Sequence, residues 1–319
     1  MARRATLAET DSAPKSIKML HAFIVISLIA VAALYVVLCP RFNYALYRPL
    51  LFHPVSLLGS DINEVPDVAG VTGESVTFKN PVGNSLYGWF YQKSGARYTV
   101  LLSHGNGGNV TYRQDTAAVL LDSGASVLIY DYRGYGNSEG LPTVDGICDD
   151  AVSAYDYLAN VRGVTSDRMV LYGESLGCAV TTNLSTRRKC AGIILQSGFA
   201  SLTQIAAEMF PVLAIYPGRL LADPPLNNLS IVKEQHPPLL IVHGHQDEVV
   251  PFSHAVAVFQ AASEPKQMLE LPSCGHNDIS VSAIPEFRRA LTDFFGSLSH
   301  ATAHSIAPSE HNAGIRQGS

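Results

Sequence analysis

The sequence predicts a protein of the α/β class, with an eight-stranded, mostly parallel sheet flanked by helices and a single apolar helix ahead of it. Two observations lead to this prediction. Short β-rich runs alternate with longer helical patterns between residues 73 and 298, the order expected of a parallel sheet wrapped by helices. Residues 19–39 form a run of 21 residues without a charge, long enough for a membrane-spanning helix.

Composition narrows the class of protein. The 319 residues exceed one small domain, but single α/β domains commonly reach about 250 residues. Only 15% of residues are charged and 47% are apolar, which excludes disorder over most of the chain. A net charge of −5 without a basic stretch argues against a nucleic-acid partner. Five cysteines without a CxxC pair exclude a disulfide-built scaffold and a zinc ribbon.

Residues 19–39 are predicted to anchor the protein in a membrane. As a helix this run spans about 30 Å, the thickness of the hydrocarbon core. A buried helix of a soluble protein and a cleaved signal peptide are the alternatives. The run is longer than the usual signal-peptide core of about 7–15 residues, and the best small-residue site, Ala30–Ala32, lies in its middle. We therefore expect an uncleaved anchor.

The basic residues around this anchor predict its orientation. Four precede it, whereas only two follow closely; they are Arg3, Arg4, Lys15 and Lys18 before it, and Arg41 and Arg48 after it. The positive-inside rule then places the N-terminus in the cytoplasm and the domain that follows on the outer side.

The predicted organisation has five parts. They are a cytoplasmic tail (1–18), the anchor (19–39), an irregular, proline-broken connector (40–72), one α/β domain (73–298) and a disordered tail (299–319).

Eight runs are predicted to be strands, and the later ones are continuously apolar, as strands buried on both faces must be. They are SVTFK (75–79), LYGWFY (86–91), TVLLS (99–103), SVLIY (126–130), RMVLY (168–172), GIILQ (192–196), LLIVH (239–243) and QMLEL (267–271). The first two are expected to form an antiparallel hairpin. Helical patterns lie near 109–122, 145–160, 176–188, 252–263 and 283–298. Chemistry in such sheets sits at the carboxyl ends of the strands.

A serine follows the run RMVLY in the pattern G-x-S-x-G, as GESLG (173–177). A nucleophile at the tip of a sharp strand-to-helix turn has strained dihedral angles, and crowding allows only small residues on either side. The N-terminus of the next helix also directs N–H groups towards a developing oxyanion. Ser175 is therefore the predicted nucleophile, with an ordinary Gly-Ser turn as the alternative.

Partners for this serine follow two later strands. A serine hydroxyl needs a base, and the base needs an orienting carboxylate, in the chain order Ser, Asp, His for this architecture. LLIVH is followed by GHQDEVVP (244–251) and QMLEL by PSCGHND (272–278). Asp247 is therefore the predicted acid and His276 the predicted base. Glu248 and Asp278, their neighbours, are expected to be solvated loop charges.

A metal site is the competing interpretation of the same region. His243, His245 and Asp247 match the H-x-H-x-D run of metal-dependent hydrolases, in which imidazoles and a carboxylate bind zinc. In those hydrolases the run continues with another histidine, where this chain has Glu248. It also comes early in their domain, whereas in this chain it follows the seventh predicted strand. We expect no metal here and interpret His243 as a packing residue at the end of its strand.

Two glycine-rich stretches border the predicted site. TVLLS continues into HGNGGN (104–109), where glycines allow close approach of the backbone to a substrate, and the N–H groups of Asn106 and Leu176 are the predicted oxyanion donors. A Gly-rich turn without a role is the alternative. SVLIY continues into DYRGYGNSEG (131–140), which resembles a dinucleotide fingerprint but has Glu139 in place of its last glycine. We expect no nucleotide and no nucleotide cofactor.

Taken together, HGNGGN, DYRGYGNSEG, GESLG, HGHQDEVVP and GHND resemble the α/β-hydrolase superfamily over about residues 70–298. More narrowly, the chain is similar to membrane-tethered serine hydrolases related to the α/β-hydrolase-domain depalmitoylases and to the serine-aminopeptidase-like branch. The resemblance implies Ser175 as nucleophile, Asp247 as acid, His276 as base, and oxyanion donation by Asn106 and Leu176. The chain departs from the depalmitoylases in having no cysteine before Cys39.

The expected function is hydrolysis of esters or thioesters of small molecules or acylated proteins. A serine peptidase, a metal-dependent hydrolase and a non-catalytic membrane-bound binding protein are the alternatives. No large lid is expected, because only 39 residues lie between Ser197 and Pro237. That interval carries an apolar patch, which is expected either to pack on the core as one short helix and turns or to form an acyl-binding rim beside Ser175. The patch consists of Met209, Phe210, Val212, Leu213, Ile215 and Leu220.

Overall fold

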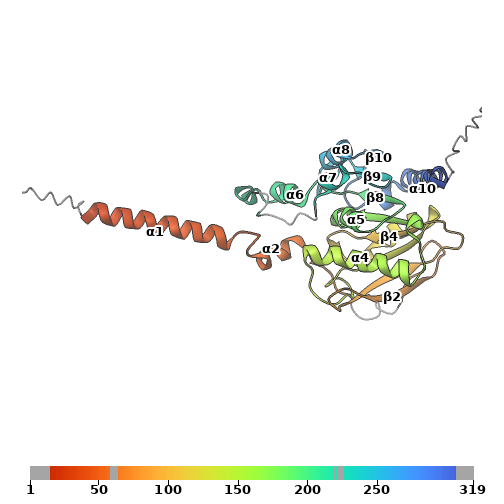
Figure 1. Cartoon of the computed structure of the whole chain (residues 1–319), viewed down its shortest axis with the longest axis horizontal. Coiled ribbons are helices and arrows are strands. Elements are labelled where there is room, and N and C mark those ends of the chain that lie inside the picture. Colours follow the sequence, from red (N-terminus) through yellow and green to blue (C-terminus); the bar gives the residue numbers. More distant parts are fainter. Residues whose placement is uncertain (1–14, 58–63, 218–219, 221–225, 307–319) are drawn as a thin grey trace, which may run out of the picture. The chain divides into compact units, whose positions relative to one another are not determined.

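The computed structural model describes residues 15–57, 64–217, 220 and 226–306 (Figure 1). The chain forms two compact units, Met1–Tyr47 and Arg48–Ser319. Most of the predicted cytoplasmic tail (1–18) and of the predicted C-terminal tail (299–319) lies outside the described residues, which begin at 15 and end at 306.

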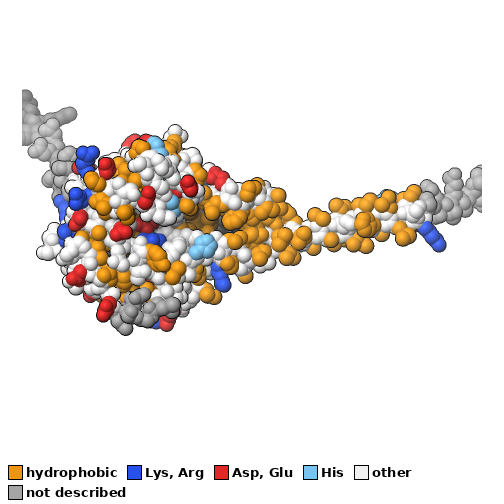
Figure 2. Space-filling model, turned by 180° about the vertical axis from the view of Figure 1, so that it is seen from behind, with side chains coloured by type: hydrophobic (Ala, Val, Ile, Leu, Met, Phe, Trp, Pro, Cys, Tyr) orange, Lys and Arg blue, Asp and Glu red, His pale blue; other side chains and the backbone are white. Residues whose placement is uncertain are grey.

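The first unit contains one long apolar helix, α1 (Lys15–Val37), with no buried side chain among its residues. Figure 2 shows apolar side chains around its exposed length. Its mean hydropathy of 2.6 over 18 residues and its length suffice to cross a membrane. The predicted run 19–39 thus lies within this helix apart from its last two residues.

The connector is more regular than predicted. It contains the helix α2 (Tyr44–Leu51) and the short strand β1 (His53–Pro54). Pro49 lies inside α2, but at a position near the end of so short a helix it removes a single backbone donor and does not prevent the turn. The prediction of an irregular connector was therefore wrong for these residues.

An eight-stranded sheet forms the centre of the second unit, and each of its strands corresponds to one predicted run. The strands are β2 (Gly73–Lys79), β3 (Ser85–Tyr91), β4 (Thr99–Ser103), β6 (Ser126–Tyr130), β7 (Met169–Glu174), β8 (Gly192–Gln196), β9 (Leu239–Gly244) and β10 (Lys266–Leu271). Their order across the sheet is β10-β9-β8-β7-β4-β6-β3-β2. Only the pairs of β3 with β2 and with β6 are antiparallel. Figure 1 shows β2 at one edge and β10 towards the other. The predicted fold class is confirmed.

Successive residues of the central strands bury opposite faces of this sheet, as the pleat requires. Ile194, Leu240 and Val242 pack into one core cluster with side chains of α3 (Gln114–Asp122) and α10 (Ile284–Ile306). Their neighbours Ile193 and Ile241 pack into a second cluster on the other face. Helices α5 (Leu176–Arg187), α7 (Asn228–Val232) and α8 (Phe252–Ala261) also contribute side chains to that cluster. Helices packed on both faces therefore hold the sheet in place, and with it the carboxyl ends of the strands from which the loops of the candidate site extend.

The five predicted helices are present as the 3₁₀ turn η2 (Val110–Arg113) with α3, and as α4 (Val144–Asn160), α5, α8 and α10. The sequence did not place the shorter helices, although one short helix between Ser197 and Pro237 was among the alternatives. These are α6 (Leu202–Met209), η4 (Pro211–Ile215), α7, η3 (Ser166–Arg168) and α9 (Ile279–Ser282). Helix α10 also continues to Ile306, beyond the predicted end at 298. Residues 299–306 contain no glycine or proline, and Ala301 and Ala303 favour helix, so nothing local stops it.

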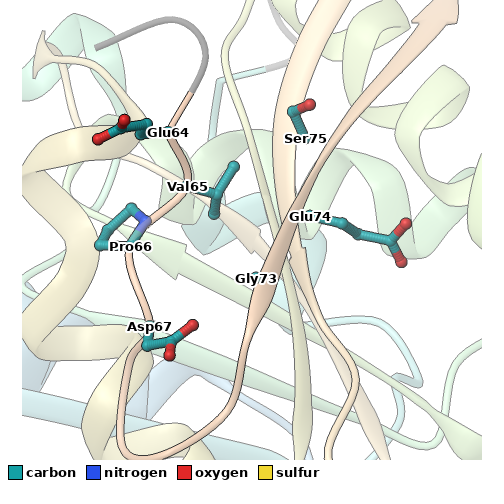
Figure 3. Close-up of a pocket in the computed structure, with 7 residues that line it drawn as sticks. All are labelled: Glu64, Val65, Pro66, Asp67, Gly73, Glu74 and Ser75. Carbon is teal, nitrogen blue, oxygen red and sulfur yellow. The ribbon is translucent and has the colours of Figure 1, made fainter. Parts of the chain in front are cut away.

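A cavity of about 700 Å³ lies beside β2, lined by residues 64–67 and 73–75 (Figure 3). The sheet register shows which edge this is. Gly73 is paired with Tyr91, and Tyr91 with Val127 near the start of β6. The cavity is therefore at the amino ends of the parallel strands, opposite the edge at which such sheets carry their chemistry. We do not regard it as the active site.

Candidate active site

Ser175 occupies the sharp turn between β7 and α5. Its backbone has φ 52° and ψ −114°, a sparsely populated conformation that costs on the order of 1–3 kcal/mol. A Cβ on Gly173 would lie 2.4 Å from the carbonyl oxygen of Gly177, and one on Gly177 would lie 1.9 Å from that of Ser103. Both flanking positions therefore exclude any side chain, which is the steric requirement that the G-x-S-x-G pattern indicated.

Three strands bring the predicted catalytic residues together at the carboxyl edge. The Oγ of Ser175, after β7, lies 3.1 Å from Nε2 of His276, which follows β10. Nδ1 of His276 lies 2.7 Å from Oδ2 of Asp247, which follows β9. Because an ionised carboxylate only accepts hydrogen bonds, Nδ1–H is the donor, and Nε2 is left as the acceptor for the serine hydroxyl. This is the arrangement by which a serine is activated.

Four donors surround the carboxylate of Asp247. Oδ1 accepts the N–H of Val249 at 2.9 Å and that of Val250 at 2.7 Å. Oδ2 accepts His276 and also lies 3.2 Å from Nε2 of His243. Burial by itself raises the pKa of Asp247, but the hydrogen bonds from the two histidines, the charge of His276 and the Val250 N–H outweigh it and hold this pKa well below its usual range. The side chain is therefore a carboxylate at every ordinary pH.

The alternative metal ligands do not converge. Nε2 of His243 lies 2.8 Å from the carbonyl oxygen of Val250 and faces Asp247. His245 instead lies on the surface, with its Nε2 3.0 Å from Oε2 of Glu270. Within the described part of the chain, no group of three or more His, Cys, Asp or Glu side chains is placed to hold a metal ion. The zinc interpretation of this run is therefore not supported, because its two imidazoles have different partners.

The predicted oxyanion loop lies directly against the serine. A Cβ on Gly105 would be 3.4 Å from the Cβ of Ser175. The hydrogen bonds that hold the next residue, Asn106, use its carbonyl oxygen, 2.9 Å from the Tyr135 hydroxyl, and its side-chain amide rather than its N–H. Leu176 is the first residue of α5, where a backbone N–H has no acceptor within the helix. The hydrogen bonds described for these two residues therefore do not use their N–H groups, and their role as oxyanion donors stays a prediction.

An ion pair behind the serine was missed at the sequence level. Nε of Arg113 lies 2.8 Å from Oε2 of Glu174, the residue before Ser175. Its Nη2 donates to the carbonyl oxygen of Gly107 at 2.9 Å, and Thr116 donates to Oε1 of Glu174 at 2.7 Å. One guanidinium therefore joins the nucleophile turn to the oxyanion loop. Only the variable position of G-x-S-x-G hinted at this, since a charge there needs a partner.

The neighbouring carboxylates differ from Asp247. Glu248 is exposed. Asp278 is half-buried and accepts the N–H of Gly275 at 2.8 Å, which closes the turn that carries His276. The imidazole of His276 is hydrogen-bonded to Asp247 and Ser175 rather than to either of these two carboxylates. His243 is more than the packing residue that we predicted, because it is a second imidazole on the carboxylate of Asp247.

Comparison with known proteins agrees with this architecture. Residues 94–233 match the family model described as serine aminopeptidase, S33. The chain is 33% identical to the uncharacterized protein Rv2307c of Mycobacterium tuberculosis over 269 residues, which are 82% of this chain and 91% of that protein. It is also 33% identical over 193 residues, 59% of each protein, to the alpha/beta hydrolase domain-containing protein 17C of Xenopus tropicalis.

A solved structure with the same fold is the esterase Pf2001 of Pyrococcus furiosus. Its TM-score is 0.64 at 19% identity, over 77% of this chain and 98% of the esterase chain. At this identity the likeness shows the fold alone. Membership of a family is shown by the relative from Mycobacterium tuberculosis, which matches over most of both chains. The chain therefore belongs to the α/β-hydrolase superfamily and is a hydrolase of that family.

Proposed function

We propose that the protein is a serine hydrolase that cleaves ester or thioester bonds through an acyl-enzyme. The observation that carries this proposal is the continuous hydrogen-bonded chain from Ser175 through His276 to Asp247. A serine nucleophile favours acyl transfer, since an aspartate at this position would have favoured dehalogenase or epoxide chemistry.

The proposed reaction has two halves. Nε2 of His276 takes the proton of Ser175 as Oγ attacks the carbonyl carbon, and Asp247 stabilises the imidazolium that forms. The N–H groups of Asn106 and Leu176 hold the oxyanion. The imidazolium then protonates the leaving alcohol or thiol, and the acyl group stays on Oγ. Water, deprotonated by the same imidazole, attacks this acyl-enzyme and releases the acid and Ser175.

The substrate class that we favour is a longer acyl chain. Helix α6 and η4 continue from the carboxyl end of β8, the strand beside β7. In η4, Val212 and Ile215 are 67% and 58% exposed, and residues three apart in a 3₁₀ helix share one edge. This edge is an apolar rim for an acyl chain. Leu213, which we had grouped with them, is instead buried, because it faces the opposite side of the same turn.

Amide substrates are the second candidate, because the matching family model is described as serine aminopeptidase. The same acyl-enzyme route cleaves an amide, so the triad does not separate the two. The dependence of kcat/KM on acyl-chain length does separate them, because an aminopeptidase requires a free amino group on the substrate rather than an apolar tail.

We further propose that α1 anchors the enzyme, with its N-terminus in the cytoplasm and the hydrolase unit on the outer side. The support is the apolar length of α1 and the excess of basic residues before it.

Ser175→Ala is expected to abolish labelling by a fluorophosphonate probe and to remove ester turnover, because no other group supplies Oγ. Ser185→Ala, on the same helix α5, is the matched control and should label as the wild type does. Labelling and gel fluorescence with and without a chelator measure both points. Labelling that survives Ser175→Ala would reject the nucleophile, and chelator-sensitive turnover would favour a metal mechanism.

Asp247→Asn is expected to lower kcat by about 10³–10⁴-fold with folding intact, because an amide does not hold the productive tautomer of the imidazole. Glu248→Gln and Asp278→Asn should each cost less than about threefold by the same account. Steady-state kinetics at pH 7 with circular dichroism as the folding control measure this. A crippling effect of Asp278→Asn would mean that the acid has been misassigned.

Val212→Asp is expected to flatten the rise of kcat/KM from acetyl to octanoyl p-nitrophenyl esters while leaving acetyl turnover intact. Each buried CH₂ contributes about 0.8 kcal/mol, so a rim that stops binding the chain loses most of that increase. Val161→Asp is the control, because Val161 is 68% exposed and follows α4 at the opposite edge of the sheet. A preference for acetyl, or for aminoacyl amides, in the wild type would reject the acyl-chain proposal.

A cysteine placed at Val82, which is 68% exposed, is expected to react with a membrane-impermeant maleimide in cells whose cytoplasmic membrane is intact. The wild type gives the background, since its five cysteines are buried or half-buried. Reaction only after the membrane is opened would place the hydrolase unit inside. Mature protein that begins after residue 30 would show a cleaved signal instead.

A further inference from the structure

The segment 53–57 of the connector is hydrogen-bonded to the loops of the candidate site. β1 pairs in parallel with β5 (Gly107–Gly108), in the oxyanion loop, with His53 opposite Gly107. Farther along, the carbonyl oxygen of Val55 accepts the N–H of Gly136 at 3.0 Å, and Leu57 donates to the carbonyl oxygen of Gly136 at 3.1 Å. One short segment, more than a hundred residues before Ser175, thus contacts two of the loops that border it.

The contact nearest to the chemistry joins His53 and Asn106 by two hydrogen bonds. The N–H of His53 donates to Oδ1 of Asn106 at 3.2 Å. Nδ2 of Asn106 lies 3.3 Å from Nδ1 of His53. An amide NH₂ only donates, so Nδ1 of His53 must be the acceptor in the neutral ring. The Tyr135 hydroxyl also donates to the carbonyl oxygen of Asn106. Hydrogen bonds therefore hold both the side chain and the backbone of Asn106.

The oxyanion loop needs such support because glycines surround Asn106. Gly107 has open space where a Cβ would lie, and Gly108 has a φ of +83°. Glycine lets the backbone adopt many conformations, so this stretch does not fix the direction of the Asn106 N–H by itself. A donor assists the transition state only when it is fixed before the reaction, and removal of one such donor costs about 10²–10³-fold in kcat.

We propose that His53 is a positioning residue that acts through the side chain of Asn106 to aim the Asn106 N–H at the oxyanion. This proposal rests on the proposed function, because it requires Ser175 as the nucleophile. His53 lies on the surface, where a hydrogen bond contributes little to folding. Its effect therefore belongs to kcat and not to stability.

The variants that test it are His53→Ala, His53→Asn, Asn106→Ala and the double variant His53→Ala/Asn106→Ala, in the full-length protein in detergent. Asn106→Ala keeps the backbone N–H and removes only the amide that His53 holds. In His53→Asn, Oδ1 of the new side chain can accept the hydrogen bond in place of Nδ1. His245→Ala is the matched control, since His245 is likewise an exposed histidine with a side-chain partner, Glu270.

We expect His53→Ala and Asn106→Ala each to lower kcat for p-nitrophenyl acetate about tenfold, a fraction of the loss of a whole donor. KM and the thermal midpoint should be unchanged. His53→Asn should recover most of kcat, His245→Ala should match the wild type, and the double variant should be no slower than either single one, because both act through one contact.

A kcat of His53→Ala within twofold of the wild type overturns the proposal. So does a double variant whose losses multiply, a failure of His53→Asn to recover activity, or a loss explained by KM or by unfolding. Ser175→Ala, measured in the same series, keeps the two ideas apart. If it retains turnover, the proposed function fails; if it is inactive while His53→Ala is normal, only the positioning role fails.

Discussion

The backbone of Ser175 has φ 52° and ψ −114°, a conformation that is unfavourable for serine by itself. The packing around Ser175 must therefore stabilise it. Strand β7 enters the turn between two neighbours, with Ser175 donating to the carbonyl oxygen of Gln196 at 2.9 Å. The helix that leaves it passes so close to the end of β4 that Gly177 has no room for a Cβ. The exposed nucleophile and the start of α5 are thus consequences of one packing arrangement.

The same sheet edge determines the electrostatics of the site. Asp247 is buried, yet its two oxygens meet four donors from its own loop, from His243 and from His276. A buried charge with all its partners is tolerated, whereas one that had lost a partner would be costly. The carboxylate can therefore stabilise an imidazolium throughout the reaction without taking its proton. For this, the loops after β9 and β10 need only keep Asp247 and His276 within hydrogen-bonding distance.

Much of this was predictable from the sequence, and the failures share a cause. The strands appear as short β-rich runs, and Ser175, Asp247 and His276 each follow the end of a strand within five residues, so local signals were enough. The pairing of His53 with Gly107 involves two residues far apart in the chain, with no periodicity to detect. Leu213 is buried beside the exposed Val212 because neighbouring residues of a helical turn point about 100–120° apart, and an unbroken apolar run does not indicate which of them faces the core.

The central claim is that Ser175 carries the acyl group between the two halves of the reaction. The most direct measurement is rapid acid quenching of wild-type protein mixed with a p-nitrophenyl ester, followed by peptide mass spectrometry. The account predicts an acyl mass on the single peptide that contains Ser175, formed with the first burst of p-nitrophenol. Steady release of p-nitrophenol with no acylated peptide, or an acyl group on Ser197 or another residue, would contradict it.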